Sequence, residues 1–276
     1  MCLILFAYRT HPAYRLVVAA NRDEFYGRPT SAASVWPDRP SILAGRDLAR
    51  GGTWMGVSTD GKFAALTNYR DPKESTDGKR SRGELVANYL DGDATPEAYV
   101  RRAAREAASY PGYNLLVGDR HELYFYSNVE RVPKRLPPGV YGVSNHLLDT
   151  PWPKVEKGKA GLAALLAEGE SLEPSSVTER LFALLADAEP APDALLPNTG
   201  VSREWERKLS SMFIRSVDDA YGTRCSTVLL MTDADMWYAE RTHERAASGA
   251  GTADEATNRA ADETGALRDV AFRIVL

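Results

Sequence analysis

The succession of apolar runs and turn signals is the feature that most constrains the fold of this chain. Residues 3–8 and 16–20 are apolar runs that flank a proline-containing segment typical of a turn. Residues 53–58 and 63–67 are two more strand-like runs, and they flank Asp60-Gly61, a strong hairpin signal. The start of the chain therefore predicts two antiparallel hairpins.

Helical signals follow these hairpins. Ser81 and Glu84 have the spacing of a capping box, ahead of apolar residues at helical intervals. Thr95 precedes Pro96 and predicts the N-cap of a helix over about 97–109. Two more helices are predicted, one over 157–167 and one after a capping box at 176–179. The same kind of pattern predicts strands at 114–118, 123–126, 140–144, 227–232, 236–240 and 270–275.

The order of these elements favours an α+β fold. Strands and helices come in separate blocks, and regular alternation of single strands and helices is absent, which favours antiparallel sheets with segregated helices. Two antiparallel sheets between helix layers and a two-layer α+β fold both satisfy this order. The 276 residues suit one domain over 1–276, in which 246–266 are small and polar and predict a flexible loop or insertion.

Composition excludes several classes of function. A net charge of -4 and a pI near 5.7 argue against a general nucleic-acid-binding surface. The chain has no run near the ~18 apolar residues of a membrane span, and its apolar opening lacks the basic start of a signal peptide. Two cysteines and four scattered histidines indicate neither a disulfide framework nor a metal site, so a cytoplasmic location is expected. The short basic cluster at 79–82 predicts a solvated loop or a contact to an anionic substrate.

Cys2 is the first candidate for chemistry. Aminopeptidase removes Met1 when the next side chain is small, and Cys2 then carries both a thiol and a free α-amine. The amine has an ordinary pKa of about 7.7–8.0, so it can serve as the base for the adjacent thiol. The alternative is a cysteine that only begins a buried strand.

Polar residues at the ends of predicted strands are the other candidates. Arg22 and Asp23 follow the apolar run at 16–20, and an antiparallel hairpin would bring them beside Cys2. Arg22 could stabilise a thiolate, and Asp23 could hold Arg22 or the α-ammonium, unless the segment is only a charged turn. The remaining candidates also flank strands: Asn68 and Asn145, as oxyanion donors or turn residues, and Arg224, as a site or surface cation, with Cys225 expected in the core.

Eight segments occur in order along the chain: Met-Cys at 1–2, Ala-Asn-Arg-Asp-Glu-Phe at 20–25, Gly-Gly-Thr-Trp-Met-Gly-Val at 51–57, Leu-Thr-Asn-Tyr-Arg at 66–70, Ser-Arg-Gly-Glu-Leu-Val at 81–86, Tyr-Asn-Leu-Leu-Val-Gly at 113–118, Gly-Val-Ser-Asn at 142–145 and Gly-Thr-Arg-Cys-Ser-Thr-Val at 222–228. Together they resemble the NRDE family, whose eukaryotic member is the transport and Golgi organisation protein 2. The resemblance implies a four-layer αββα sandwich of antiparallel sheets, the fold of N-terminal nucleophile hydrolases. It also implies distant kinship with choloylglycine hydrolases and penicillin V acylases.

The resemblance also implies a set of site residues. Carried over by position, they are Cys2 as nucleophile, Arg22 and Asp23 after the first hairpin, Asn68 and Asn145 as oxyanion donor and amine-positioning residue, and Arg224 as a late arginine. In the related hydrolases two residues separate the arginine from the aspartate, whereas Arg22 and Asp23 are adjacent. Adjacent strand residues face opposite sides, so either the backbone bends, or Glu24 supplies the acid and Asn21 takes the arginine position.

Two functions are compatible with these residues. The first is an amidohydrolase or acyltransferase that acts on a non-peptide acyl amide or thioester through Cys2, without cofactor or metal. The second follows from the resemblance alone, because the eukaryotic relatives are connected with lipid, acyl-coenzyme A and haem homeostasis. In that case the protein is a non-enzymatic carrier of haem or acyl-coenzyme A.

Overall fold

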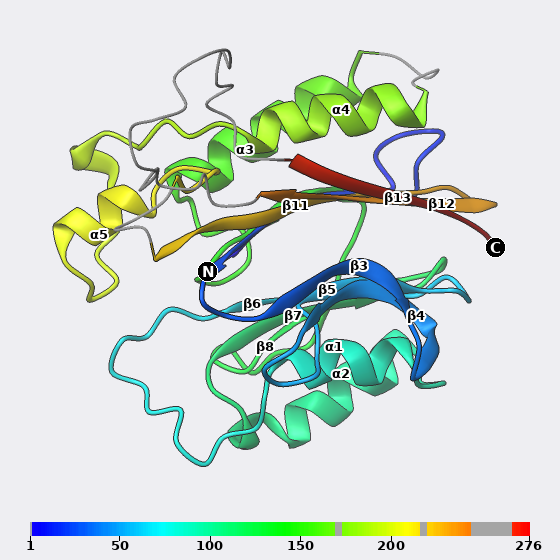
Figure 1. Cartoon of the computed structure of the whole chain (residues 1–276), viewed down its shortest axis with the longest axis horizontal. Coiled ribbons are helices and arrows are strands. Elements are labelled where there is room, and N and C mark those ends of the chain that lie inside the picture. The colour runs from blue at the N-terminus through cyan, green and yellow to red at the C-terminus, as the bar shows by residue number, and fades with distance from the viewer. Residues whose placement is uncertain (1, 169–172, 216–219, 244–266) are drawn as a thin grey trace, which may run out of the picture.

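The computed structural model describes residues 2–168, 173–215, 220–243 and 267–276, which form two stacked β-sheets between two helix layers (Figure 1). The six-stranded sheet has the order β10-β1-β2-β11-β12-β13 and the seven-stranded sheet the order β3-β4-β5-β6-β7-β8-β9, and the strand pairings are antiparallel. The strands of the first sheet are β10 (Gly139–Val143), β1 (Cys2–Tyr8), β2 (Leu16–Phe25), β11 (Tyr221–Met231), β12 (Asp235–His243) and β13 (Leu267–Val275). Those of the second are β3 (Thr30–Trp36), β4 (Arg39–Asp47), β5 (Met55–Ser58), β6 (Phe63–Asn68), β7 (Tyr113–Gly118), β8 (Leu123–Ser127) and β9 (Lys134–Arg135).

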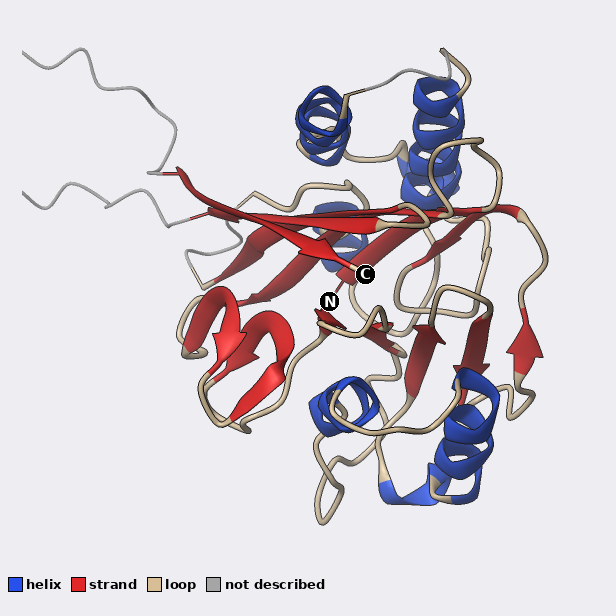
Figure 2. Cartoon of the chain, turned by 90° about the vertical axis from the view of Figure 1, so that its right-hand side faces the viewer, coloured by secondary structure: helices blue, strands red, loops and turns tan. Residues whose placement is uncertain are grey.

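Helices cover the outer face of each sheet (Figure 2). The seven-stranded sheet carries α1 (Gly83–Leu90) and α2 (Pro96–Arg105), and the six-stranded sheet carries α3 (Pro153–Leu166) and α4 (Pro174–Leu185). The short elements are η1 (Ala107–Ser109), η2 (Asp193–Leu195) and α5 (Arg203–Lys208). This arrangement confirms the predicted αββα sandwich. No helix in the described ranges is long and apolar enough to cross a membrane.

β1 is buried on both faces because it lies in the middle of the sandwich. Ile4 and Phe6 face the apolar layer between the sheets, whereas Leu3 and Leu5 face the helices. A strand covered on both faces is apolar throughout rather than alternating, which is the pattern the sequence shows at 3–8. A Cβ on Gly158 of α3 would lie 2.5 Å from Leu5 Cδ1, so this glycine lets α3 lie close on β1.

The hairpins predicted from the sequence are confirmed. β1 pairs with β2, β5 with β6, β7 with β8 and β11 with β12. Thr95 Oγ1 accepts from Ala98 N at 3.3 Å, so the predicted N-cap of α2 is also confirmed. The capping box at Ser81 is wrong, because the N-cap of α1 is Arg82 and no side chain caps this helix. The helix α4 begins at Pro174, ahead of the predicted box at 176–179.

Other differences from the expected elements are additional or longer strands. The sequence signals did not indicate β3 and β4, whose residues lack a regular apolar alternation. β2 continues through the charged residues to Phe25, since β11 pairs with it as far as Tyr221. The predicted loop at 246–266 lies outside the described residues.

Candidate functional site

Cys2 begins β1 at the edge of a cavity between the two sheets. Its side chain belongs to the layer between the sheets, is 7% exposed and lines the cavity, whose volume is about 730 Å³. Its register partner on β2 is Arg22, and Leu3 is paired with Asn21. The hairpin geometry expected from the sequence is therefore confirmed, since it brings the polar segment after Ala20 beside Cys2.

Alternation along β2 sends Arg22 and Asp23 to opposite faces of the sheet. Ala20 lies in the layer between the sheets and Ala19 in the helix-facing layer, so Arg22 shares the face of Cys2. Asp23 is fully buried and accepts a hydrogen bond from Thr223 Oγ1 at 2.7 Å. The backbone N–H of Asp23 also lowers the pKa of the Cys2 thiol. Both side chains therefore flank Cys2, from different sides of its strand.

Asn21 lies on the helix-facing side of the sheet, whereas a substitute for the arginine of the site would have to face the cavity. Its Nδ2 donates to Leu185 O and Met212 O, both at 2.9 Å, and its Oδ1 accepts from Ser226 Oγ at 2.6 Å. These contacts hold Asn21 in the helix-facing layer. The alternative in which Asn21 takes the arginine position is therefore not supported by this geometry.

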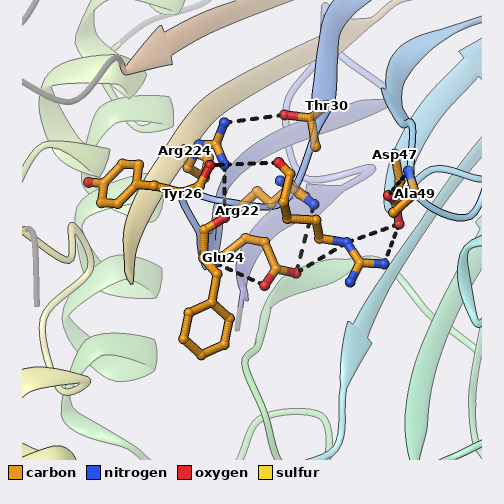
Figure 3. A network of polar contacts seen from close by, with 9 residues as sticks. Arg22, Glu24, Tyr26, Thr30, Asp47, Ala49 and Arg224 are labelled. Atoms are coloured by element: carbon orange, nitrogen blue, oxygen red, sulfur yellow. Dashed lines mark hydrogen bonds and ion pairs between the residues drawn. The ribbon is translucent and has the colours of Figure 1, made fainter. Parts of the chain in front are cut away.

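Arg224 lies at an irregularity of β11. The register of β11 against β2 shifts between Thr223 and Cys225, so Arg224 is the extra residue of a β-bulge. Its guanidinium donates to Phe25 O at 2.9 Å and Tyr26 O at 3.2 Å, which anchors the chain after β2 (Figure 3). Arg224 thus lines the cavity as a cation held by main-chain carbonyls.

Ion pairs hold the neighbouring cations in place (Figure 3). Glu24 Oε2 lies 3.8 Å from Arg22 Nη2 and 3.9 Å from Arg28 Nε. Arg28 Nη2 lies 2.6 Å from Asp47 Oδ2, and this bond raises the pKa of Arg28. Glu24 therefore bridges two arginines at the cavity wall.

The two asparagines, Asn68 and Asn145, lie close together near Cys2. Asn68 ends β6 and lines the cavity, and Asn145 Nδ2 donates to Asn68 O at 2.9 Å. Ser144 Oγ donates to Cys2 O at 3.0 Å, and it lies 3.3 Å from Asn145 Oδ1. Asn145 thus connects the ends of β6 and β10 near Cys2, while its amide nitrogen is occupied. Sequence reasoning missed Ser144, although it lies within the segment at 142–145.

Burial controls the ionisation of the thiols. It raises the pKa of the Cys2 thiol, and this effect outweighs the lowering by the Arg22 guanidinium and the Asp23 N–H. The thiol therefore needs a base in order to react at neutral pH. Cys225 is buried as expected, and burial together with Glu240 raises the pKa of its thiol still further above the ordinary range.

Two charged residues near the site, Glu240 and Lys154, escaped sequence reasoning. Glu240 of β12 accepts from Ala33 N at 2.7 Å and is buried, so it links the two sheets at the cavity. Lys154 of α3 is buried, and Arg82 donates to Gly112 O at 3.0 Å. A lysine at the start of a helix is usually solvated, so only the packing of α3 could reveal its burial.

The cavity is lined by more cations than acids. The cations are Arg22, Arg28, Arg46, Arg50, Lys79, Arg80, Arg82, Arg224 and Arg268. The acids are Asp23, Glu24, Asp47 and Glu240. The basic cluster at 79–82 therefore lies at the cavity wall. The described ranges hold no group of three or more His, Cys, Asp or Glu that could bind a metal ion.

Comparisons with known proteins place this chain in a family. The chain is 40% identical over 255 residues to the transport and Golgi organization protein 2 homolog of Bos taurus, covering 85% of this chain and 90% of that protein. The Homo sapiens homolog is 37% identical over 253 residues, with 85% and 90% covered. Among solved structures, a mutant of the conjugated bile acid hydrolase from Clostridium perfringens superposes with a TM-score of 0.50 at 10% identity, over 86% of this chain and 88% of that one, which supports the N-terminal nucleophile hydrolase fold. The model of the Transport and Golgi organisation 2 family matches residues 1–245, and the chain belongs to that family.

Proposed function

We propose that this protein is an amidohydrolase or acyltransferase that uses Cys2 as its nucleophile once Met1 has been removed. One observation carries the proposal: the Cys2 thiol begins a central strand and lines the cavity beside Arg22. A nucleophile at a cavity edge next to a cation is a suitable arrangement for acyl transfer. The similarity in fold to a conjugated bile acid hydrolase supports the proposal.

The chemistry begins with proton transfer from the thiol to the α-amine of Cys2. The thiolate attacks the acyl carbonyl carbon, and Asn68, at the end of β6, donates a hydrogen bond to the oxyanion. The C–N or C–S bond to the leaving group breaks, and the ammonium returns its proton to that group. Water or an amine then attacks the thioester on Cys2, transfers its proton to the amine and releases the acyl product.

The flanking residues have separate parts in this mechanism. Arg22 stabilises the thiolate from the cavity side of β2, and Arg224 adds positive charge at the same wall. Asp23, on the other face, orients the α-ammonium. Asn145 holds the backbone of Asn68 and so positions the oxyanion donor.

Mass spectrometry with a thiol-alkylating reagent tests the activated nucleophile. We expect the purified protein to lack Met1 and to take up one alkyl group rapidly at Cys2, with Cys225 slower because its thiol pKa is higher. Below the thiol pKa the rate should rise about tenfold for each unit of pH, because only the thiolate reacts. Retained Met1, or alkylation of Cys225 before Cys2, would contradict the proposal.

The cations of the cavity favour a second candidate function, the binding of acyl-coenzyme A or haem, both of which are anionic. We expect palmitoyl-coenzyme A or hemin to bind more weakly as salt increases, and Arg50→Gln to weaken binding several-fold, since Arg50 lines the cavity. The matched control is Arg101→Gln on α2, because Arg101 lies outside the cavity in an exposed ion pair with Glu97. Calorimetric titration that shows no effect of salt or of Arg50→Gln would exclude this mode. Binding that persists after Cys2 is alkylated would favour a carrier over an enzyme.

A further inference from the structure

Several charged side chains are buried close to Cys2, on the helix-facing side of the six-stranded sheet. Lys154 of α3 is only 3% exposed, and its Nζ donates to Leu209 O at 2.9 Å. Asp23 of β2 is 1% exposed and lies on the same face of the sheet. The charged and titratable groups that act on Lys154 are Asp23 of β2, Arg70 after β6, Cys2 of β1 and Glu206 of α5.

Glu206, the other acid of this cluster, already has an ion-pair partner and hydrogen-bond donors. Glu206 Oε2 lies 2.8 Å from Arg70 Nη1. Its Oε1 accepts from the backbone N of Thr199 at 2.7 Å and from Thr199 Oγ1 at 2.6 Å. Glu206 is therefore paired with Arg70, and Asp23 is the other carboxylate whose charge acts on Lys154.

Asp23 is also next to the chain start. In the antiparallel register, Cys2 is opposite Arg22, so the backbone nitrogen of Cys2 points along β1 toward the level of Asp23. The charge of Asp23 raises the pKa of the Cys2 thiol and its backbone N–H lowers it, as expected for neighbouring residues. In the processed protein, Asp23 therefore lies at the level of the α-amine, on the helix-facing side of the sheet where Lys154 is also buried.

We infer that Lys154 is a positioning residue whose positive charge, buried on the same side of the sheet as Asp23, keeps the Cys2 α-amine uncharged, so that the amine can act as the base. This inference rests on the proposed function, because it requires a free amine on Cys2. A buried carboxylate alone would favour the ammonium form, which has no lone pair to accept the thiol proton. Lys154 offsets that effect with its own positive charge. Burial lowers the pKa of Lys154 to about 8, against the opposing effect of Asp23, so the two amines compete for charge near neutral pH.

Titration of the Cys2 amine by NMR tests the inference. The chain has two cysteines, so [13C]cysteine labelling yields signals from Cys2 and Cys225, and Cys225→Ala assigns them. The Cα shift of Cys2 follows its amine, and its Cβ shift, which follows the thiol, separates the two titrations. We expect a wild-type midpoint at or below the ordinary ~7.7–8.0, a rise of about one unit in Lys154→Met, and a midpoint no higher than the wild type in Lys154→Arg, whose charge does not titrate in this range.

The outcomes separate this inference from the proposed function. An unchanged midpoint in Lys154→Met, or a wild-type midpoint above about 9, would overturn the role of Lys154 while the nucleophile stands. Retained Met1, visible beforehand in the intact mass, would overturn both. If Lys154→Met does not fold, Lys154→Gln replaces it, because its amide can donate to the Leu209 carbonyl without carrying charge. A loss of folding stability alone would not move the midpoint.

Discussion

Replacement of Cys2 by alanine is expected to lower the turnover of acyl amide or thioester substrates by roughly a thousandfold or more. Removal of the nucleophile abolishes covalent catalysis and leaves only the contribution of binding and oxyanion stabilisation. The fold should persist, because the substitution removes one sulfur atom at the edge of a cavity. Steady-state rates on a panel of acyl amides and thioesters, with circular dichroism as the check on folding, measure both effects.

Cys225→Ala is the matched control for this substitution. Cys225 lies on β11, is buried to a similar degree and also has Arg22 as its register partner. We expect it to keep turnover within a few-fold of the wild type, since the proposed chemistry does not use its thiol. Turnover that survives Cys2→Ala, or that disappears equally in both variants, would exclude Cys2 as the nucleophile.

We expect Glu206→Ala to lower the free energy of unfolding by about 3–5 kcal/mol, the largest stability effect of these variants. The side chains of Arg70 and Glu206 are 7% and 2% exposed, so the substitution leaves a guanidinium buried without its carboxylate. It also removes the acceptor of Thr199 N and Oγ1. For a domain of this size the loss corresponds to a decrease in Tm of roughly 10 °C, which differential scanning calorimetry would measure.

Glu97→Ala provides the comparison at the surface. The side chains of Glu97 and Arg101 on α2 are 47% and 65% exposed, so the loss of this pair should cost no more than about 1 kcal/mol. The double variant Arg70→Met with Glu206→Leu should recover part of the stability lost in Glu206→Ala, because no unpaired charge stays buried. Equal decreases in Tm for Glu206→Ala and Glu97→Ala would show that Arg70 finds another partner.

The sequence by itself determined the hairpins and the residues that neighbour Cys2 on β2. Runs buried on both faces and short turn signals are local patterns, so the pairing of β1 with β2 and of β5 with β6 could be predicted without tertiary information. The same pairing places Arg22 opposite Cys2. Ordered segments that resemble a known family then indicated which strand ends carry the site.

Local patterns could not predict β3 and β4. Their burial is irregular, and Glu240 of β12 contributes a contact to the backbone of Ala33 from the other sheet. Strand formation there depends on partners that are distant in the sequence, whereas periodicity indicates only which side of an element is buried. The capping box at Ser81 failed for a related reason, because spacing alone does not decide where a helix begins.

Only the tertiary structure decided how the charges are distributed around Cys2. The bulge at Arg224 arises from the register between β11 and β2, and the split of Arg22 and Asp23 to opposite faces depends on β2 continuing as a strand. Lys154 becomes a buried charge because α3 packs closely on β1 at Gly158. The free energy of a charge depends on the groups that surround it in space, and those groups come from segments more than a hundred residues apart. Position along the chain and the family resemblance therefore indicated the candidate residues, while packing determined their burial and the charges around them.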